Sequence, residues 1–117
     1  MLTKEAILTA QDIVTETVSV PEWGGEVLVR GMTGRERDVF EQAIIQRKGR
    51  DTNVNMRDLR AKLAAFCMVD EGGQRIFTDG DVETLSGKSA AALQRVFDVA
   101  SRLSGLTPAD AEELTKN

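Results

Sequence analysis

The sequence of 117 residues contains no histidine and no tyrosine, only one cysteine and only one tryptophan. Without histidine, the chain lacks the usual general base near neutral pH, the commonest zinc ligand and the central residue of a Ser-His-Asp triad. The single cysteine, Cys67, excludes an intramolecular disulfide and fits a reducing compartment. Because Cys67 falls among apolar residues with helical spacing, we interpret it as a small buried hydrophobe and not as a nucleophile. These absences indicate that the protein is not an enzyme.

Long apolar segments are also missing. No run approaches the roughly 20 apolar residues that a helix needs to span a membrane, and the first eight residues are too short and too polar for a secretion signal. We therefore expect a cytoplasmic protein without membrane contact. The composition, 41% hydrophobic and 29% charged, is typical of a folded domain. We predict a single domain over residues 1–110, followed by a flexible C-terminal tail at 111–117.

Two segments resemble ligand-binding motifs but lack residues that the motifs require. Gly87-Lys88-Ser89 looks like the end of a phosphate-binding loop, but the glycine needed five positions earlier is Val82. Asp79, Asp81 and Glu83 look like the opening of a calcium loop, but the glycine and glutamate that complete such a loop are absent. We therefore expect no cofactor and no metal site.

The charges are unevenly distributed along the chain. Residues 1–29 hold one basic and five acidic residues, residues 30–62 hold nine and five, and residues 63–117 hold five and nine. A basic middle between acidic ends suits head-to-tail self-association, although a surface of mixed charge serves solubility equally well. Nucleic-acid binding is not expected, because the whole chain is acidic and its basic middle has no interleaved aromatic residues.

A β-hairpin is predicted near the N-terminus. Residues 13–20 alternate between apolar and polar side chains, with Val14, Val18 and Val20 on one face and Glu16 as its polar exception. A second alternating segment follows a turn that contains one proline and two glycines. The only tryptophan, Trp23, lies in this turn, where a large aromatic residue either folds back onto the core or anchors a partner. We favour the core position, because tryptophan is highly buried on average.

Four helices are predicted after the hairpin from their start signals and apolar spacing. The first begins at the capping box Thr33-Gly34-Arg35-Glu36 and runs to about Lys48. Asn55 caps the second, Thr78 caps a short third, and Ser89 caps a longer fourth. The second helix carries a stripe of residues predicted to be buried, namely Met56, Leu59, Leu63, Phe66 and Cys67.

Shorter segments complete this prediction. Residues 3–12 form either a short helix or an arm packed on the body, 51–55 form a polar loop, and 67–69 pair with 75–77 in a very short hairpin. A last short helix begins at Thr107, ahead of a proline. The predicted fold class is α+β, mainly helical, with an N-terminal β-hairpin followed by about four helices.

Several short motifs follow one another in an order that resembles a known family. The segment Val20-Pro21-Glu22-Trp23-Gly24-Gly25 leads into a strand that ends in Arg30, and Arg37-Asp38-Val39-Phe40 follows. Further along are Val69-Asp70-Glu71-Gly72-Gly73 and Phe77-Thr78. Together these motifs, spread over residues 3–110, resemble the tail assembly chaperones of long-tailed bacteriophages and prophages. The family-motif residues that we take as candidates for binding a partner are Pro21, Glu22, Trp23, Gly24, Gly25, Arg30, Arg37 and Phe40.

The resemblance implies a non-catalytic role in phage tail assembly. Members of this family bind the long, largely helical tape measure protein, keep it soluble, and help the major tail protein to polymerise around it. They act in the cytoplasm of the bacterial host, leave before the tail is complete, and are absent from the mature virion. They also tend to self-associate into rings or helical arrays. No cofactor is involved.

The family also suggests a longer form of the protein, made by ribosomal frameshifting. Many members are extended in this way near the end of the short reading frame, and Thr115-Lys116-Asn117 is compatible with an A-rich slippery sequence. Two alternatives to the chaperone remain open. One is another small phage structural protein, such as a head–tail joining or completion protein, and the other is a host adaptor that contacts nucleic acid through the basic middle.

Overall fold

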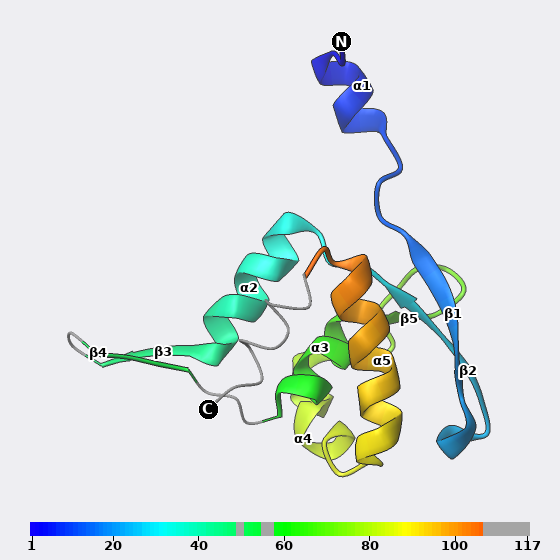
Figure 1. The fold of residues 1–117 in the computed structure, drawn as a ribbon, viewed down its shortest axis with the longest axis vertical. Helices are drawn as coiled ribbons and strands as arrows, with labels where there is room; N and C mark the ends of the chain where they lie inside the picture. Colours follow the sequence, from blue (N-terminus) through cyan, green and yellow to red (C-terminus); the bar gives the residue numbers. More distant parts are fainter. Residues whose placement is uncertain (49–50, 55–57, 107–117) are drawn as a thin grey trace.

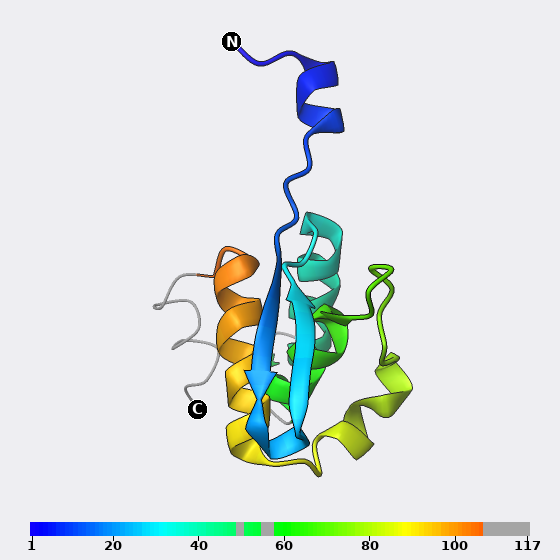
Figure 2. The same cartoon turned by 90° about the vertical axis from the view of Figure 1, so that its right-hand side faces the viewer.

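The computed structural model describes residues 1–48, 51–54 and 58–106. Its body is an antiparallel sheet covered on one face by helices, and an N-terminal arm and a second hairpin project from this body (Figure 1). In the perpendicular view the sheet stands in front of the helices that cover it (Figure 2). The predicted fold, α+β and mainly helical with a hairpin followed by about four helices, is confirmed.

The predicted hairpin consists of β1 (Thr15–Val20) and β2 (Gly25–Arg30), which pair antiparallel. Val18, Val20 and Val29 are buried against the helices, and the β1 residues that alternate with them are exposed. This alternation is the period of two that one buried sheet face requires.

A third strand, β5 (Met68–Val69), extends the sheet in the order β1-β2-β5. The predicted pairing of 67–69 with 75–77 is confirmed in part, by a bridge between Val69 and Arg75 and by a hydrogen bond from Ile76 N–H to the Met68 carbonyl at 3.2 Å. Both residues of β5 are buried, and their other edge pairs with β2, which the sequence did not predict. A strand in a sheet can bond neighbours on both edges, and β5 uses both.

Two helices cover the inner face of the sheet. α3 (Leu59–Cys67) lies at the centre of the molecule, and most of its residues are buried. α5 (Ala90–Leu103) packs beside it, and its predicted cap is confirmed, since the Ser89 hydroxyl accepts a hydrogen bond from the Ala92 N–H at 3.2 Å. The buried residues of α5 recur at helical spacing and comprise Ala92, Leu93, Val96, Phe97, Ala100 and Ser101.

α2 (Gly34–Ile44) begins as predicted but ends earlier. Its capping box is present, because Glu36 N–H donates to the Thr33 hydroxyl and the Glu36 carboxylate accepts from Thr33 N–H. The predicted extension to Lys48 is wrong, since the chain leaves the helix after Ile44 and forms β3 (Ile45–Lys48).

A second hairpin therefore replaces the end of the predicted helix and the predicted polar loop. β3 pairs antiparallel with β4 (Asp51–Val54), so that Ile45 faces Val54 and Lys48 faces Asp51. Consecutive β-branched residues at 44–45, together with Thr52 and Val54, favour an extended backbone over a helix. The β propensity of these residues thus explains why the helix that the sequence predicted up to Lys48 ends at Ile44.

The connection from β2 to α2 lies directly against the end of α5. Gly31 has no side chain, and a Cβ atom there would collide with the Leu103 carbonyl oxygen. The next residue, Met32, donates its N–H to the Ser104 hydroxyl at 2.9 Å. The close approach of the two backbones explains why glycine occupies position 31.

A short helical segment follows β5. It combines a 3₁₀ turn, η2 (Asp79–Asp81), with α4 (Val82–Leu85). The predicted cap at Thr78 is confirmed, because the Asp81 carboxylate accepts from Thr78 N–H at 2.8 Å. These hydrogen bonds to Thr78 lower the pKa of Asp81.

The N-terminal arm comprises α1 (Lys4–Thr9) and the extended residues that join it to β1. No residue of α1 is buried, so the arm is not packed on the body. Val14 is 55% exposed and lies outside β1, so the prediction that the strand begins at residue 13 and that Val14 shares a face with Val18 and Val20 is wrong. Its carbonyl nevertheless accepts a hydrogen bond from Gly31 N–H, and this bond fixes the point where the arm leaves the body.

Several predictions fall outside the described residues. These are the cap at Asn55, the buried position of Met56, the last short helix from Thr107 and the flexible tail at 111–117. At the start of α3 the position of the cap is held by Asp58, whose φ is 58°.

Candidate functional site

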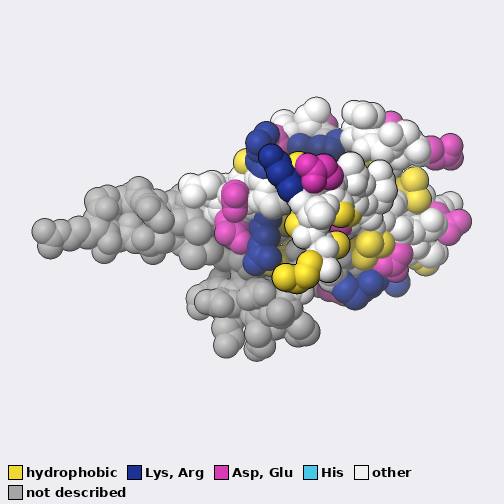
Figure 3. Space-filling model, turned by 90° about the horizontal axis from the view of Figure 1, so that it is seen from above, with side chains coloured by type: hydrophobic (Ala, Val, Ile, Leu, Met, Phe, Trp, Pro, Cys, Tyr) yellow, Lys and Arg dark blue, Asp and Glu magenta, His cyan; other side chains and the backbone are white. Residues whose placement is uncertain are grey.

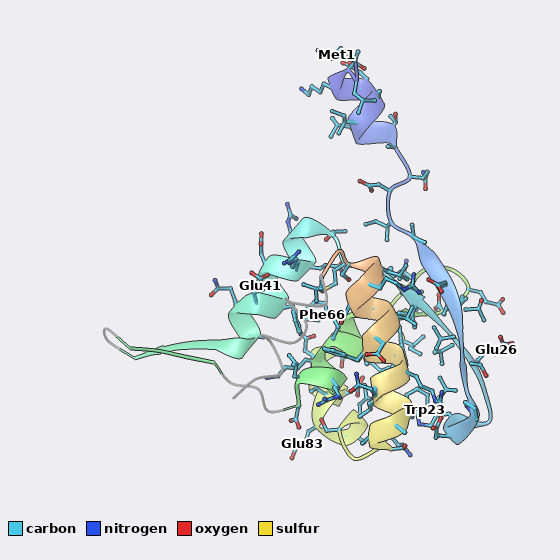
Figure 4. The ribbon with its side chains drawn as sticks, viewed as in Figure 1. Met1, Trp23, Glu26, Glu41, Phe66 and Glu83 are labelled. Carbon is cyan, nitrogen blue, oxygen red and sulfur yellow. The ribbon has the colours of Figure 1, made fainter. Side chains whose placement is uncertain are left out.

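The structure separates the candidate residues into two groups at opposite ends of β2. Pro21 to Gly25 form the tip of the first hairpin, while Arg30 ends β2 and Arg37 and Phe40 lie in α2, which follows it. Figure 4 shows Trp23 at the hairpin tip, far from Met1 at the end of the arm. The family motif therefore does not mark one contiguous surface.

The hairpin tip is a 3₁₀ turn, η1 (Pro21–Trp23), closed by a left-handed glycine. Proline at its first position fixes φ, and Gly24 adopts φ of 73°, which a residue with a side chain rarely does. Gly25 then starts β2. These residue types are explained by the turn itself, and they hold Trp23 in place.

The tip is tied to α5 by an ion pair. The Arg95 Nε atom lies 3.0 Å from a Glu22 carboxylate oxygen, and this hydrogen bond lowers the pKa of Glu22. A second ion pair joins β1 of the same hairpin to α5, with the Arg102 guanidinium 2.7 Å from the Glu16 carboxylate. Glu16, the polar exception in the predicted strand, is therefore explained by a partner on α5.

An apolar groove lies beside the hairpin tip. We call it the Trp23 groove, and it encloses about 480 Å³. Trp23 is half-buried: part of its side chain packs against the core and part lines the groove. The lining residues are Glu22, Trp23, Val27, Met68, Ile76, Phe77, Leu85 and Lys88. The predicted core position of Trp23 is thus only part of its role.

The Trp23 groove brings together motif segments that are far apart in the sequence. Phe77, from the Phe-Thr motif, lies in the same groove as Trp23. Ile76 is 46% exposed, which is unusual for a large aliphatic side chain beside an apolar groove. Charged side chains, Glu22 and Lys88, stand among the apolar lining. This combination of apolar and charged lining suits a partner with an apolar face and polar edges.

Arg30 holds the start of α2 against the end of β2. Its guanidinium makes two hydrogen bonds of 2.8 Å to the Glu36 carboxylate and one of 2.9 Å to the Gly31 carbonyl. The Arg30 guanidinium beside Glu36 is the main reason that the pKa of Glu36 falls to about 2, and the Thr33 N–H contributes as well. Arg30 therefore acts inside the molecule, as a clamp between a strand and a helix.

The other two candidates on α2 also have partners inside the molecule. Arg37 forms an ion pair with Glu41 one helical turn later, at 3.0 Å. Phe40 is only 1% exposed, and its ring packs edge to face on Phe66 with a centroid distance of 6.3 Å. Figure 4 places Phe66 in the interior, between the helices. Phe40 is thus a core residue and offers no surface to a partner.

A second groove lies on the other side of the body, among α2, α3 and the η2–α4 segment. We call it the Val39 groove, and it encloses about 460 Å³. Val39 is 50% exposed at its edge, and Phe66 and Val82 lie along it. The polar and charged residues of its lining are Asp58, Lys62, Asp79 and Glu83. Sequence reading did not identify this groove.

The only cysteine lies in the core and lines neither groove. The thiol of Cys67 is buried in α3, and burial raises its pKa to about 12, which keeps it protonated at neutral pH. Within the described part of the chain, no group of three or more metal-ligating side chains comes together. None of the helices in that part is long and apolar enough to cross a membrane.

Most of the groove residues carried no signal in the sequence. Met68, Leu85 and Lys88 stand on three separate segments, and no spacing rule links them. Phe77 was marked only by its family motif, whereas Trp23 was also singled out as the only tryptophan and as a residue of the hairpin turn. The grooves therefore depend on tertiary packing, which brings short and unrelated segments together.

Comparison with known proteins agrees with the motif pattern. The chain matches the family model described as "Phage tail assembly chaperone" over residues 2–117. Its fold is similar to that of a solved structure described as "Structure of bacteriophage HK97 tail assembly chaperone". The two chains share 20% sequence identity at a TM-score of 0.57, and the alignment covers 89% of this chain and 92% of the other. No curated protein matches this sequence.

Proposed function

Since the chain belongs to the family of phage tail assembly chaperones, we propose that it binds the tape measure protein of its phage and keeps it soluble until the tail tube forms. The resemblance read from the motifs is confirmed at the level of the family. The observation that carries the finer proposal is the Trp23 groove, an exposed apolar surface next to the family motif.

The groove is suited to one apolar face of a helical client. A long helical protein that has not yet assembled exposes stripes of apolar side chains and aggregates through them. The lining of Trp23, Ile76 and Phe77 offers those side chains an alternative partner. Burial of one large aliphatic side chain is worth about 1.5–3 kcal/mol, so a few such contacts give reversible binding.

Reversible binding fits a chaperone that must dissociate from its client before the tail is complete. We propose that this chaperone helps the major tail protein to polymerise around the tape measure protein and is then released. Its action is non-catalytic, takes place in the cytoplasm of the bacterial host, and leaves no chaperone in the mature virion. The support for this proposal is family membership together with the apolar lining of the groove.

Co-expression with the tape measure protein tests this function. We expect the client to become soluble and to co-purify with the chaperone. We further expect Ile76→Asp to reduce recovery of the soluble client by at least about tenfold, since a carboxylate would have to be buried in the apolar contact. Ile76 is 46% exposed, so this change should leave the fold intact, as checked by circular dichroism.

Gln42→Asp is the matched control, because it places the same side chain on an exposed position of α2 outside both grooves. It should behave like the wild type. A client that stays insoluble with the wild type would refute the chaperone function. A soluble client with Ile76→Asp would refute the groove as its site. Detection of the protein in purified virions by mass spectrometry would favour a joining or completion protein instead.

A further inference from the structure

A further groove lies on the outer face of the sheet, which is turned away from α3 and α5. We call it the sheet groove, and it encloses about 500 Å³. Its floor is a row of side chains across the three strands, because Thr17 pairs with Leu28 and Leu28 pairs with Val69. Figure 2 shows this face of β1 and β2 in front of the helices, where a partner can reach it.

The sheet groove is continuous with the Trp23 groove, since Val27 and Ile76 line both of them. The strand β5 has two residues and pairs with β2 at Leu28 and Val29. Within the described strands, the part of β2 that precedes Leu28 therefore has no neighbour on that edge. The two grooves meet there, beside the exposed side chain of Ile76. We call the two together the joined groove, and one segment of a partner can lie across it.

The part of the joined groove over the sheet is acidic. The sheet groove is lined by Glu26, Asp70 and Glu71, and none of the described residues that line it is basic. The Asp70 carboxylate accepts hydrogen bonds from the Gly72 and Gln74 N–H groups of its own turn, and these bonds leave its negative charge in place. Within residues 1–48, 51–54 and 58–106, neither Glu26 nor Glu71 forms an ion pair.

The pictures agree with this placement of the acidic residues. Figure 4 shows Glu26 on the outer side of the sheet. In the view from above, Asp and Glu side chains stand at the right-hand side of the molecule, which is the side of the sheet in Figure 1 (Figure 3).

The part of the joined groove near the hairpin tip has the opposite charge balance. Lys88 is the basic residue of the Trp23 groove, and the carboxylate of Glu22 is already paired with Arg95. The apolar side chains of Trp23 and Phe77 make up much of the remaining lining. The joined groove is therefore acidic at one end and apolar with a positive charge at the other.

This charge distribution determines which apolar segments fit. A segment that is apolar throughout would cover the three carboxylates of the sheet groove without a counter-charge, which is unfavourable. Lysine or arginine at one end of the apolar stripe would supply that counter-charge, whereas Lys88 would repel basic residues at the other end. Complementary charges of this kind contribute to specificity more than to affinity.

We propose that the joined groove binds segments of the helical client in which an apolar stripe has basic residues at one end, with that end over the sheet groove. The apolar side chains supply most of the affinity, and the basic residues distinguish these segments from others that are equally apolar. This inference deepens the proposed function and rests on it, since it names the class of client segment that the chaperone holds.

Overlapping peptides that span the tape measure protein test this class. Each peptide carries a dye and is titrated with the purified full-length chain, and fluorescence anisotropy gives the dissociation constant. We expect the bound peptides to have lysine or arginine at one end of an apolar stripe. Equally apolar peptides without basic residues should bind at least about tenfold more weakly. Added salt should weaken the basic peptides several-fold, because exposed charges are screened.

Charge reversal in the sheet groove tests the site. Glu26→Lys/Glu71→Lys should weaken the basic peptides about tenfold or more, since it places like charges opposite each other. The same variant should bind more tightly than the wild type when the basic residues of the peptide are replaced by glutamate. Glu5→Lys/Asp38→Lys is the matched control, because it changes the net charge equally at exposed carboxylates outside the joined groove. Circular dichroism checks that both variants are folded.

The outcomes separate this inference from the proposed function. Equal affinity of the wild type and Glu26→Lys/Glu71→Lys for the basic peptides, or an equal loss in the control variant, would overturn the inference. In either case a client that is soluble on co-expression would leave the proposed function intact. A wild type that binds no peptide would also overturn the inference, and a client that stays insoluble as well would overturn the proposed function.

Discussion

Glu36 performs two tasks at a single position. It completes the capping box of α2 with Thr33 and binds the guanidinium of Arg30 through both carboxylate oxygens. The side chains of Arg30 and Glu36 are only 16% and 23% exposed, whereas those of Arg37 and Glu41 are 37% and 43% exposed. Ion pairs with less exposure to solvent are screened less, so the Arg30–Glu36 pair should contribute more to stability.

The pH dependence of unfolding should reveal this contribution. The pKa of Glu36 falls from 4.5 to about 2 on folding, so its stabilisation is present above about pH 4.5 and is lost as the pH falls toward 2. We expect Glu36→Gln to lower the free energy of unfolding at pH 7 by about 1–2 kcal/mol and to flatten its dependence on pH between 4.5 and 2. Urea titrations at several pH values measure both effects.

Glu41→Gln is the control for this experiment, because it removes the carboxylate of the more exposed pair with Arg37. Its effect should stay below about 0.5 kcal/mol. Equal effects of the two changes would contradict a special role for Glu36. The capping box was predicted from sequence, but the second partner, Arg30, was not, because their contact depends on the path of the chain through Gly31.

The end of α5 holds the connection between β2 and α2 in place. Its last residues meet the connection between β2 and α2, where Met32 N–H donates to Ser104. One turn earlier, Ser101 is 5% exposed and its hydroxyl oxygen has no hydrogen-bond partner among the described residues. Ser101 is thus a buried serine whose hydroxyl has no partner among the described residues, whereas Ser104 is a partly exposed serine whose hydroxyl accepts a hydrogen bond.

Alanine substitutions should separate these two serines. Ser104→Ala removes a partner from a part-buried backbone N–H and should destabilise the protein by about 1 kcal/mol. Ser101→Ala removes a buried hydroxyl without a partner and should be neutral or stabilise by up to about 1 kcal/mol. Thermal or urea unfolding of the two variants provides the comparison. Destabilisation by Ser101→Ala equal to that of Ser104→Ala would show that its hydroxyl is satisfied in solution.

Helix starts were better predicted than helix ends. The caps at Thr33, Thr78 and Ser89 are local signals, since each involves a side chain and an N–H three residues away. The end of α2 is different, because the stripe that suggested a longer helix overlaps with β-branched residues that pair across β3 and β4. The β-branched residues favour an extended backbone locally, but which segment a strand pairs with is a contact between segments that neither segment determines alone.

At the scale of the whole molecule, the arm and the body are energetically separate. No residue of α1 is buried, and within the described residues the arm is bonded to the body through the Val14 carbonyl. The hydrophobic cluster of the body begins at Val18. The arm should therefore contribute nothing to the stability of an isolated copy.

Deletion of residues 1–12 tests this separation. At low protein concentration the shortened chain should melt within about 2 °C of the full chain, since no buried contact is lost. Scanning calorimetry of the full and the shortened chain measures this difference. A large loss of stability at low concentration would mean that the arm packs on its own body.

The grooves are also properties of the whole molecule, because each is formed by several segments that are far apart in the sequence. For this reason the sequence did not reveal them. The Trp23 groove is built from the hairpin tip, the strands β2 and β5, the segment after β5, and the end of α4 with the loop that follows it. These segments come together only after the sheet and helices have packed. The hairpin, most helix starts and the burial of Cys67 could be predicted because they depend on local pattern. Surfaces made by several segments could not.

Trp23 also makes the protein its own optical reporter. It is the only tryptophan, no tyrosine is present, and its half-buried ring lines the groove proposed for the client. Light absorbed near the red edge of the aromatic band therefore excites one indole at one place. A tryptophan-free client peptide that covers this ring should shift its emission to shorter wavelength and protect it from a soluble quencher. Occupancy of the groove could then be followed in real time without attaching a dye.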